Sequence, residues 1–300
     1  MVSKTRKYKK VAVLKGGPSS EREISLKSGA AVAKGLKAAG YDVIEIDVRE
    51  RKLDIPDGVE AVFIALHGEF GEDGQVQALL EAKKLPYTGS TPASSRASFD
   101  KRLSKKIFLQ AGIPTAPYEV LTPDSQLTLP YPVVIKPPCQ GSTIGIFKVN
   151  TQAGWEVAFR ESLKYDGEVI AEAFIPGREL TVGIVGKTVL PAIEILAPDG
   201  WYDFTAKYGK GQSRHLCPAP LTPAIADRAG KIALETFRAL GCHGLGRVDF
   251  RLTEDGQLYV LELNNIPGFT ETSLLPEAAH ANGIGFAELC AIIMEMARVS

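Results

Sequence analysis

Polar side chains alternate with apolar ones on both sides of a turn signal late in the chain. Two apolar runs, 248–252 and 258–263, flank the dipeptide Asp255-Gly256, which is typical of a two-residue hairpin turn. In a sheet, cross-strand partners and residues two apart share one face. A hairpin with this turn therefore gathers polar side chains on one side, namely Arg247 opposite Asn264 and Asp249 opposite Glu262.

Two carboxylates directly opposed in a half-buried sheet repel each other, unless one is protonated or a cation lies between them. Carboxylate and amide oxygens suit a hard ion such as Mg²⁺, which normally also takes phosphate oxygens. The pattern therefore predicts a metal site formed by Asp249, Glu262 and Asn264. The alternative is a solvated sheet face with compensating charges.

Two glycine-rich stretches could bind phosphate. The loop Gly141–Gly145 follows a predicted strand that ends in Lys136, so backbone N–H groups and a positive charge lie near one another. The segment Gly16–Ser20 precedes a predicted helix, whose N-terminus can bind an anion. Neither stretch matches the P-loop or the dinucleotide-binding consensus, which argues against a dehydrogenase, and each alone could be an ordinary turn.

Strands and helices alternate in the first third of the chain, which predicts a parallel sheet. We expect strands at 11–14, 43–47 and 62–66, and helices capped by Ser19 or Ser20 and over 75–82. Parallel sheets bind ligands at the carboxyl ends of their strands. The dipeptides Gly16-Gly17 and His67-Gly68 both fall at such ends.

The remaining two thirds predict a helix, a boundary and then an antiparallel α+β region. The expected elements are a helix over 100–111, a domain boundary near 114–129, strands at 133–136, 169–172, 179–185 and 189–193, a mobile loop over 202–220 and a helix opened by Thr222-Pro223. The last three strands follow one another without long helices, which favours antiparallel pairing.

Composition narrows the class of protein. The chain has 300 residues, 35 basic and 35 acidic, and 45% hydrophobic residues, as expected for a multidomain globular protein. Five basic residues lie within the first ten positions, so the body is slightly acidic, which argues against nucleic-acid binding. Four dispersed cysteines indicate a reducing compartment. With no apolar run of about 18 residues, we expect a cytoplasmic protein without a membrane segment.

Seven motifs occur in order along the chain: VAVLKGGPSSEREIS (11–25), ALHGEFGEDG (65–74), DK (100–101), IKPPCQGSTIG (135–145), AKY (206–208), GRVDF (246–250) and LELNNIPGFTETSL (261–274). Together they resemble the D-alanine–D-alanine ligases of the ATP-grasp superfamily, and the resemblance covers nearly the whole chain. It implies an N-terminal parallel-sheet (pre-ATP-grasp) α/β domain over 1–98. A two-part ATP-grasp fold of α+β type then follows, with a central part over 99–182 and a C-terminal part over 183–300, and ATP lies between the two parts.

The resemblance also implies a role for each matching residue at the nucleotide. Those residues are Lys101 and Lys136 at the phosphates, Gly141, Ser142 and Thr143 in the loop over the γ-phosphate, Glu172, Ala173, Phe174 and Ile175 in the linker whose backbone meets adenine, Glu179 at the ribose, and Lys207 as a further contact. Asp249, Glu262 and Asn264 match the family's magnesium ligands, in agreement with the hairpin register. The implied cofactors are ATP and Mg²⁺, with Mn²⁺ as a substitute.

At the amino-acid substrates the resemblance implies a second set of residues. They are Glu21 at the ammonium of the first D-alanine with His67 nearby, Ser142 and Tyr208 hydrogen-bonded to Glu21, Arg247 and the Gly268 N–H at the oxyanion, and Ser273 and the Leu274 N–H at the second carboxylate. The implied reaction forms an acyl phosphate and then D-alanyl-D-alanine for peptidoglycan precursors. Tyrosine at position 208 accompanies dipeptide rather than D-alanyl-D-lactate formation in this family. We expect a homodimer with no nucleic-acid or membrane partner.

Several residues depart from the family pattern and leave substrate preference open. They are Gln140, Thr143, Thr205 and Asn265, where the family usually has Glu, Ser, Glu and Thr. The competing functions are a related carboxylate–amine ligase, or D-alanine–D-lactate ligase, with other substrates, and a catalytically silent nucleotide-binding protein. Taken singly, the key residues also have plainer interpretations: a surface lysine at Lys101, a helix-dipole complement at Glu21, a satisfied core histidine at His67 and a packing residue at Tyr208.

Overall fold

The computed structural model describes residues 6–141, 144–196 and 214–300. In this part of the chain the strands form three sheets. The first is parallel, with the order β2 (Asp42–Val48), β1 (Lys10–Gly16) and β3 (Ala61–Ile64). Residues Val11 to Leu14 of β1 are completely buried, as expected for the central strand of a sheet that is covered on both faces.

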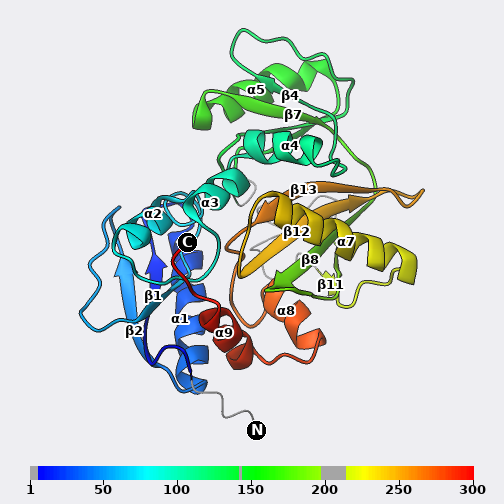
Figure 1. Ribbon diagram of the computed structural model, residues 1–300. Coiled ribbons are helices and arrows are strands. Elements are labelled where there is room, and N and C mark those ends of the chain that lie inside the picture. The colour runs from blue at the N-terminus through cyan, green and yellow to red at the C-terminus, as the bar shows by residue number, and fades with distance from the viewer. Residues whose placement is uncertain (1–5, 142–143, 197–213) are drawn as a thin grey trace.

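Two helix layers cover this parallel sheet. Val11 and Val13 pack toward α1 (Arg22–Ala38) and α9 (Phe286–Glu295), whereas Ala12 and Leu14 pack toward α2 (Gln75–Ala82). Helix α9 therefore returns from the far end of the chain to lie beside α1, as Figure 1 shows. After α2 come α3 (Pro92–Phe99) and α4 (Lys101–Gln110), which lead out of this unit.

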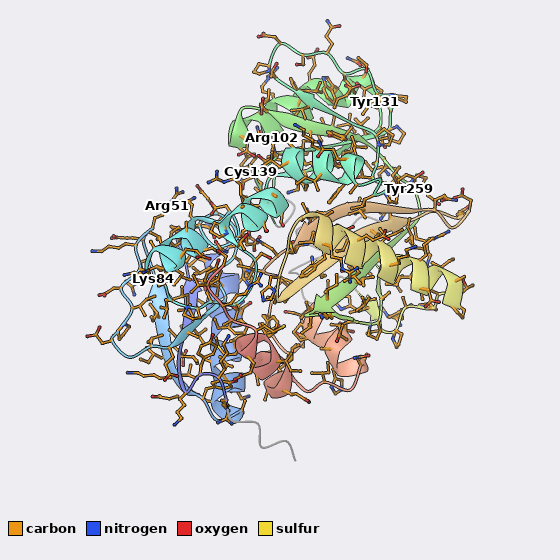
Figure 2. All side chains as sticks on the ribbon, in the orientation of Figure 1. Arg51, Lys84, Arg102, Tyr131, Cys139 and Tyr259 are labelled. Atoms are coloured by element: carbon orange, nitrogen blue, oxygen red, sulfur yellow. The ribbon has the colours of Figure 1, made fainter. Side chains whose placement is uncertain are left out.

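The second sheet is antiparallel. Its order is β4 (Tyr118–Leu121), β7 (Val169–Ala173), β5 (Val133–Lys136) and β6 (Phe147–Val149). Helix α5 (Gln152–Asp166) packs on it through Trp155 and Ala158. Figure 2 shows this unit at the top of the molecule, with Tyr131 on it and Tyr259 on the separate hairpin at the right. The stretch 114–129, where we expected a boundary, contributes strand β4.

The third sheet has the order β11-β10-β8-β12-β13, with β9 paired to β8. Its strands are β8 (Arg178–Val185), β9 (Thr188–Val189), β10 (Ile193–Leu196), β11 (Arg214–Leu216), β12 (Leu245–Leu252) and β13 (Leu258–Asn264). Helix α7 (Pro223–Ala239) covers one face, and α8 (Leu274–Ala281) contacts β8. Strand β8 spans the predicted boundary after residue 182, so that division would cut a strand of this sheet.

The hairpin β12–β13 corrects the predicted turn but confirms the pairing at the polar face. Leu252 pairs with Leu258, and the Thr253 N–H donates to the Gln257 carbonyl at 2.9 Å, which leaves residues 254–256 as the loop. The Gly256 N–H donates to the Thr253 carbonyl, with Gly256 at φ +82°. This is a three-residue loop with glycine in the left-handed position. A bulge beside Phe250 then restores the register, so that Asp249 pairs with Glu262. The predicted two-residue turn was wrong, and the bulge compensates the extra residue.

Three other predictions about elements need correction. Glu21, rather than Ser19 or Ser20, is the N-cap residue of α1. The strand expected over 189–193 is interrupted, because β9 ends at Val189 and β10 begins at Ile193, with Pro191 between them. The predicted mobile loop over 202–220 contains strand β11 at 214–216, and its residues 202–213 lie outside the described residues.

Candidate active site

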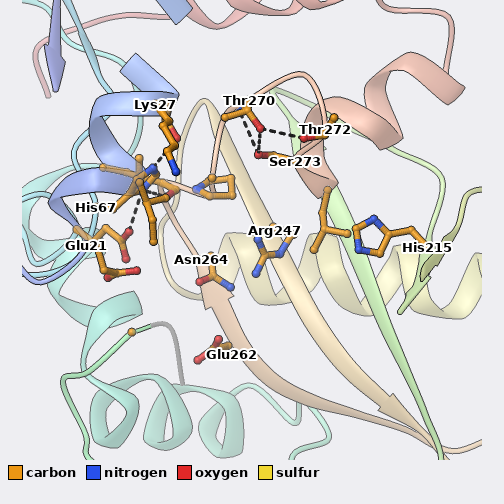
Figure 3. A pocket seen from close by; sticks show the side chains of 18 residues that line it. Glu21, Lys27, His67, His215, Arg247, Glu262, Asn264, Thr270, Thr272 and Ser273 are labelled. Atoms are coloured by element: carbon orange, nitrogen blue, oxygen red, sulfur yellow. Dashed lines mark hydrogen bonds and ion pairs between the residues drawn. The ribbon is translucent and has the colours of Figure 1, made fainter. Parts of the chain in front are cut away.

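A polar pocket of about 340 Å³ lies where the first and third sheets meet. Its lining residues come from six places: the start of α1, the segment after β3, the segment after β5, strand β11, the ends of β12 and β13, and the N-terminus of α8 with the loop before it. They include Glu21, Ser28, His67, Glu72, Gly141, His215, Arg247, Glu262, Asn264, Gly268, Ser273 and Leu274. Figure 3 shows Glu21 and His67 on one side, Arg247 and Asn264 in the middle with Ser273 above them, and His215 on the opposite side.

The hairpin brings its polar side chains together as its register predicted. The Arg247 guanidinium donates two hydrogen bonds to Asp249, from Nε to Oδ1 at 2.9 Å and from a terminal nitrogen to Oδ2 at 2.8 Å. The Asn264 amide donates to Asp249 Oδ2 at 3.0 Å, and Thr181 Oγ1 donates to Oδ1 at 2.6 Å. Asp249 thus accepts hydrogen bonds from three neighbours in a largely buried position.

Glu262 connects the hairpin to the phosphate-binding candidates. Its carboxylate lies 3.6 Å from the Lys101 ammonium, and Lys101 Nζ also donates to the Gln140 carbonyl at 2.7 Å. Lys101 is buried at the start of α4, where Asp100 is the N-cap residue. Lys101 therefore contacts both the segment before Gly141 and the acidic face of the hairpin. A phosphate bound between that segment and the hairpin would lie next to the Lys101 ammonium.

The donor set at the hairpin fits a Mg²⁺ ion that also binds phosphate. Two carboxylates and one amide side chain supply hard oxygen ligands. Across residues 6–141, 144–196 and 214–300, no three His, Cys, Asp or Glu side chains gather closely enough to hold a metal ion by themselves. A Mg²⁺ ion held by Asp249, Glu262 and Asn264 would complete its coordination with water or phosphate oxygens.

Glu21 lies against both glycine-bearing segments of the pocket. A Cβ added to Gly68 would come 2.7 Å from Glu21 Oε2, and one added to Gly141 would come 2.8 Å from the same oxygen. Glu21 makes no side-chain capping bond to α1, although it is the N-cap residue. The carboxylate is buried and lines the pocket instead, so a purely helix-capping role does not account for it.

His67 is held on both ring nitrogens. Nδ1 donates to the Ile266 carbonyl at 3.1 Å, since a carbonyl can only accept, and Nε2 lies 3.0 Å from Ser28 Oγ. Nδ1 is also 3.4 Å from Glu72. Burial raises the pKa of Glu72, with the Glu21 carboxylate adding to that effect and His67 opposing it. His67 is thus a buried residue with partners for both ring nitrogens, and it also lines the pocket.

The N-terminus of α8 faces the pocket beyond Arg247. Ser273 is its N-cap residue and Leu274 its first helical residue. Ser273 Oγ accepts from the Thr270 N–H at 2.9 Å, which fixes the loop before the helix, and Gly268 lies close enough that a Cβ on it would be 3.5 Å from this oxygen. The first N–H groups of a helix have no intrahelical partner and favour an anion.

The predicted nucleotide residues lie between the second and third sheets. Lys136 Nζ is 2.6 Å from Glu172 Oε1, with both side chains buried. In the linker, the Ala173 and Phe174 N–H groups donate to proline carbonyls, at Pro117 and Pro132 respectively. These bonds hold the linker at the end of β7, between the segments that lead into β4 and β5.

A buried arginine on β12 also holds the linker. Arg251 Nε donates to the Ile175 carbonyl at 3.1 Å, and Arg251 forms an ion pair with Glu179 at 3.2 Å. Its guanidinium lies 5.5 Å from the centre of the Phe174 ring. Arg251 therefore connects the linker to the strand that carries Asp249.

Comparisons with known proteins identify the family. Residues 48–90 match the family described as D-ala D-ala ligase N-terminus, and residues 107–295 match D-ala D-ala ligase C-terminus. The D-alanine--D-alanine ligase of Methylacidiphilum infernorum is 48% identical over 286 residues, covering 95% of this chain and 94% of the relative. The chain belongs to the D-alanine–D-alanine ligase family.

Solved structures agree with this family. The D-alanine--D-alanine ligase from Bacillus anthracis complexed with ATP has a TM-score of 0.84 and 31% identity, covering 96% of this chain and 97% of that one. The VanG D-Ala:D-Ser ligase from Enterococcus faecalis has a TM-score of 0.86 and 28% identity, covering 97% and 99%. The predicted fold class, a parallel-sheet unit followed by an ATP-grasp fold, is confirmed.

Some predicted residues of this ligase-family site lie outside the described residues. They are Ser142, Thr143, Thr205, Lys207 and Tyr208. The two other departures from the family pattern have structural partners. Gln140 offers its carbonyl to Lys101, and the buried Asn265 amide donates to the Glu72 carbonyl at 3.0 Å. Asn265 thus holds the segment that carries Glu72 against the strand end.

Sequence reasoning missed several residues that the site uses. Glu72 follows His67 by five positions, in a glycine-rich segment with no periodic pattern to mark it. Lys105 lies one helical turn after Lys101, and that spacing was an available signal for a shared face. His215, whose Nδ1 lies 2.8 Å from Glu277, follows a polar stretch and reaches the pocket only through strand β11.

Proposed function

We propose that this protein joins two D-alanines into D-alanyl-D-alanine, converting ATP to ADP and phosphate, for peptidoglycan precursors. The observation that carries the proposal is the convergence of three kinds of group on one pocket. An ammonium-binding carboxylate at Glu21, a phosphate- and metal-binding face at Glu262 and Asn264, and an anion-binding helix N-terminus at Leu274 line the same cavity. Family membership supports the same reaction.

The proposed chemistry has two steps. The carboxylate of the first D-alanine attacks the γ-phosphorus of ATP, which gives an acyl phosphate and ADP. The amine of the second D-alanine, having lost a proton, attacks the acyl carbon, and inorganic phosphate leaves. The residues act by positioning the reactants and neutralising charge, so no covalent enzyme intermediate is needed.

We assign each described residue a part in this reaction. Glu21 binds the ammonium of the first D-alanine, and the N-terminus of α8 binds the carboxylate of the second. Lys101 and Lys136 bind phosphate oxygens, and Arg247 stabilises the oxyanion formed at the acyl carbon. Mg²⁺ bound at Asp249, Glu262 and Asn264 would neutralise phosphate charge.

Phosphate release from ATP across a panel of acceptors tests the function. With the purified protein and Mg²⁺, we expect release with D-alanine and little with L-alanine, D-lactate or no acceptor. Mass spectrometry should find D-alanyl-D-alanine in the D-alanine reaction. Efficient use of D-lactate or D-serine as second substrate would replace the proposal by a ligase of different specificity, and phosphate release without a joined product would contradict it.

Glu21→Gln is expected to raise the KM for the first D-alanine by about tenfold or more, because a charged hydrogen bond contributes roughly 1.5–3 kcal/mol. The KM for ATP should change far less. Glu23→Gln, at an exposed position of the same helix, is the matched control and should behave as the wild type. Equal effects of Glu21→Gln on both KM values would favour a helix-stabilising role. Initial-rate kinetics with each substrate varied separately measures the two.

We propose that the protein works in the cytoplasm, because the reaction consumes ATP, and that it forms a homodimer. Within the ranges that the structure describes, no helix is long and apolar enough to cross a membrane. The dimer stays a prediction from the sequence, which sedimentation equilibrium of the purified protein would test.

A further inference from the structure

A lysine outside every role assigned above lies completely buried behind the phosphate site. Lys105 is on α4, one turn after Lys101, and α4 lies between the second and third sheets (Figure 1). Its Nζ is 2.9 Å from Glu172 Oε1 and donates to Thr115 Oγ1 at 2.7 Å. Lysine is almost never fully buried unless it is paired, so this position calls for a specific reason.

Lys105 shares its carboxylate with a residue of the nucleotide site. Lys136 Nζ lies 2.6 Å from the same oxygen, Oε1 of Glu172, so two ammonium groups contact one buried carboxylate. Burial alone would raise the pKa of Glu172, but Lys105 and then Lys136 outweigh it and lower that pKa. Glu172 is therefore ionised, and it attracts whichever lysines remain near it.

The shared oxygen creates a conflict when nucleotide binds. If Lys136 contacts a phosphate, as the proposed function requires, its charge is divided between the phosphate and Glu172. A buried carboxylate that loses its only partner is strongly unfavourable. Lys105 removes the conflict, because it stays with Glu172 while Lys136 turns to the ligand.

Lys105 is fixed in place for this task. Thr115 Oγ1, which accepts from Lys105, donates to the Val260 carbonyl at 2.9 Å, and Val260 lies on the strand that carries Glu262. The centre of the Tyr118 ring lies 5.3 Å from Lys105 Nζ. These contacts come from the third and second sheets, so the ammonium is anchored independently of any ligand.

We propose that Lys105 is a positioning residue of the nucleotide site, which keeps Glu172 paired and so releases Lys136 to bind phosphate. The inference rests on the proposed use of ATP and concerns only nucleotide binding. A purely structural role would lower the stability and the amount of active protein, but would leave the affinity of the folded protein for nucleotide unchanged.

Calorimetric titration with ADP and Mg²⁺, without amino acids, tests the proposal. Lys105→Met should weaken ADP binding at least about tenfold, and Lys105→Arg, which keeps the charge, should recover much of it. Lys106→Met changes the exposed neighbour on the same helix and should bind as the wild type. In steady-state assays Lys105→Met should raise the KM for ATP but change that for D-alanine less than about twofold.

A double-mutant cycle distinguishes action through Glu172 from a direct effect on phosphate. In a Glu172→Gln background the competing carboxylate is gone, so adding Lys105→Met should change ADP affinity by less than about twofold. A loss in that background as large as in the wild type would overturn the proposal. If Lys105→Met alone does not fold, the double variant is compared with Glu172→Gln alone, and a loss of about tenfold or more between them would overturn the proposal. The double variant leaves no buried carboxylate unpaired.

The pH dependence gives a second readout. Burial lowers the pKa of Lys105 to about 8, with Lys136 also lowering it, while Glu172 and Glu262 raise it. The ammonium is therefore present below pH 8 and is lost above it, after which Glu172 depends on Lys136. ADP affinity should fall more steeply above pH 8 in the wild type than in Lys105→Arg, and identical profiles would contradict the proposal.

Failure of this inference and failure of the proposed function are distinguishable. If the wild type joins no amino acids, but the ADP affinities of the wild type and the Lys105 variants differ as expected above, the ligase proposal fails and the role of Lys105 stands. If the wild type makes the dipeptide but Lys105→Met binds ADP normally, the reverse holds. ADP that does not bind the wild type at millimolar concentration overturns the role of Lys105.

Discussion

Glu262→Gln is expected to lower kcat by at least about a hundredfold while leaving the protein folded. Loss of a group that only orients a metal ligand typically costs 10–100-fold, and Glu262 is proposed as a ligand itself. The fold should persist because Glu262 pairs directly opposite Asp249 on the hairpin, so removing one charge relieves repulsion between two carboxylates. Phosphate release at saturating ATP and D-alanine measures kcat, and circular dichroism checks the fold.

The matched control for this prediction is Glu254→Gln. Glu254 lies at the exposed turn of the same hairpin, so its loss changes the net charge equally without touching the pocket. A wild-type rate in Glu262→Gln would exclude the metal assignment. A low rate that excess Mg²⁺ restores would support it, because a weakened site fills at higher metal concentration.

Arg247→Met should lower kcat by about 10²–10³-fold, the usual effect of removing one donor from an oxyanion site. The guanidinium stands at the centre of the pocket and is held in a fixed orientation by two bonds to Asp249. Lys at this position keeps the charge but not the planar fork, so Arg247→Lys should have an intermediate kcat. Arg238→Met, at an exposed position on α7, is the control.

The metal requirement separates two roles for Arg247. If the arginine only orients Asp249, its loss should raise the Mg²⁺ concentration needed for half-maximal activity, and excess Mg²⁺ should restore kcat. If it stabilises the oxyanion, kcat should stay low at every Mg²⁺ concentration. The second outcome is expected, because the guanidinium bonds to both Asp249 oxygens, which a cation bound there would have to share with it.

The β12–β13 hairpin shows which structural features can be predicted from local sequence. Its two apolar runs and the Asp-Gly dipeptide predicted two strands and a polar face, and the structure pairs Asp249 with Glu262 as expected. The turn was predicted one residue too short, and a bulge on β13 corrects the register before the polar face. A bulge depends on twist and packing in the whole sheet, which the pattern of one hairpin does not contain.

Long-range contacts decided what local patterns left open. Glu21 could have been a helix-dipole residue, and only its approach to Gly68 and Gly141 placed its carboxylate at the pocket. Helix α9 packs on α1 although the two helices lie near opposite ends of the chain. The hydrophobic periodicity of each helix predicts a buried face but does not identify the element that covers it. Contacts of this kind depend on shape complementarity between surfaces that are far apart in sequence.

Local features of the sequence were sufficient to predict the order of the main strands and helices, the acidic face of the hairpin and, through ordered motifs, the family. These follow from side-chain periodicity, turn residues and motif spacing, which are local properties of the chain. Which charged side chains share a partner depends instead on the three-dimensional fold. Lys105 looks like any lysine on an amphipathic helix, yet it lies completely buried beside Glu172 and Lys136, because burial and pairing arise only when separate sheets close around a side chain.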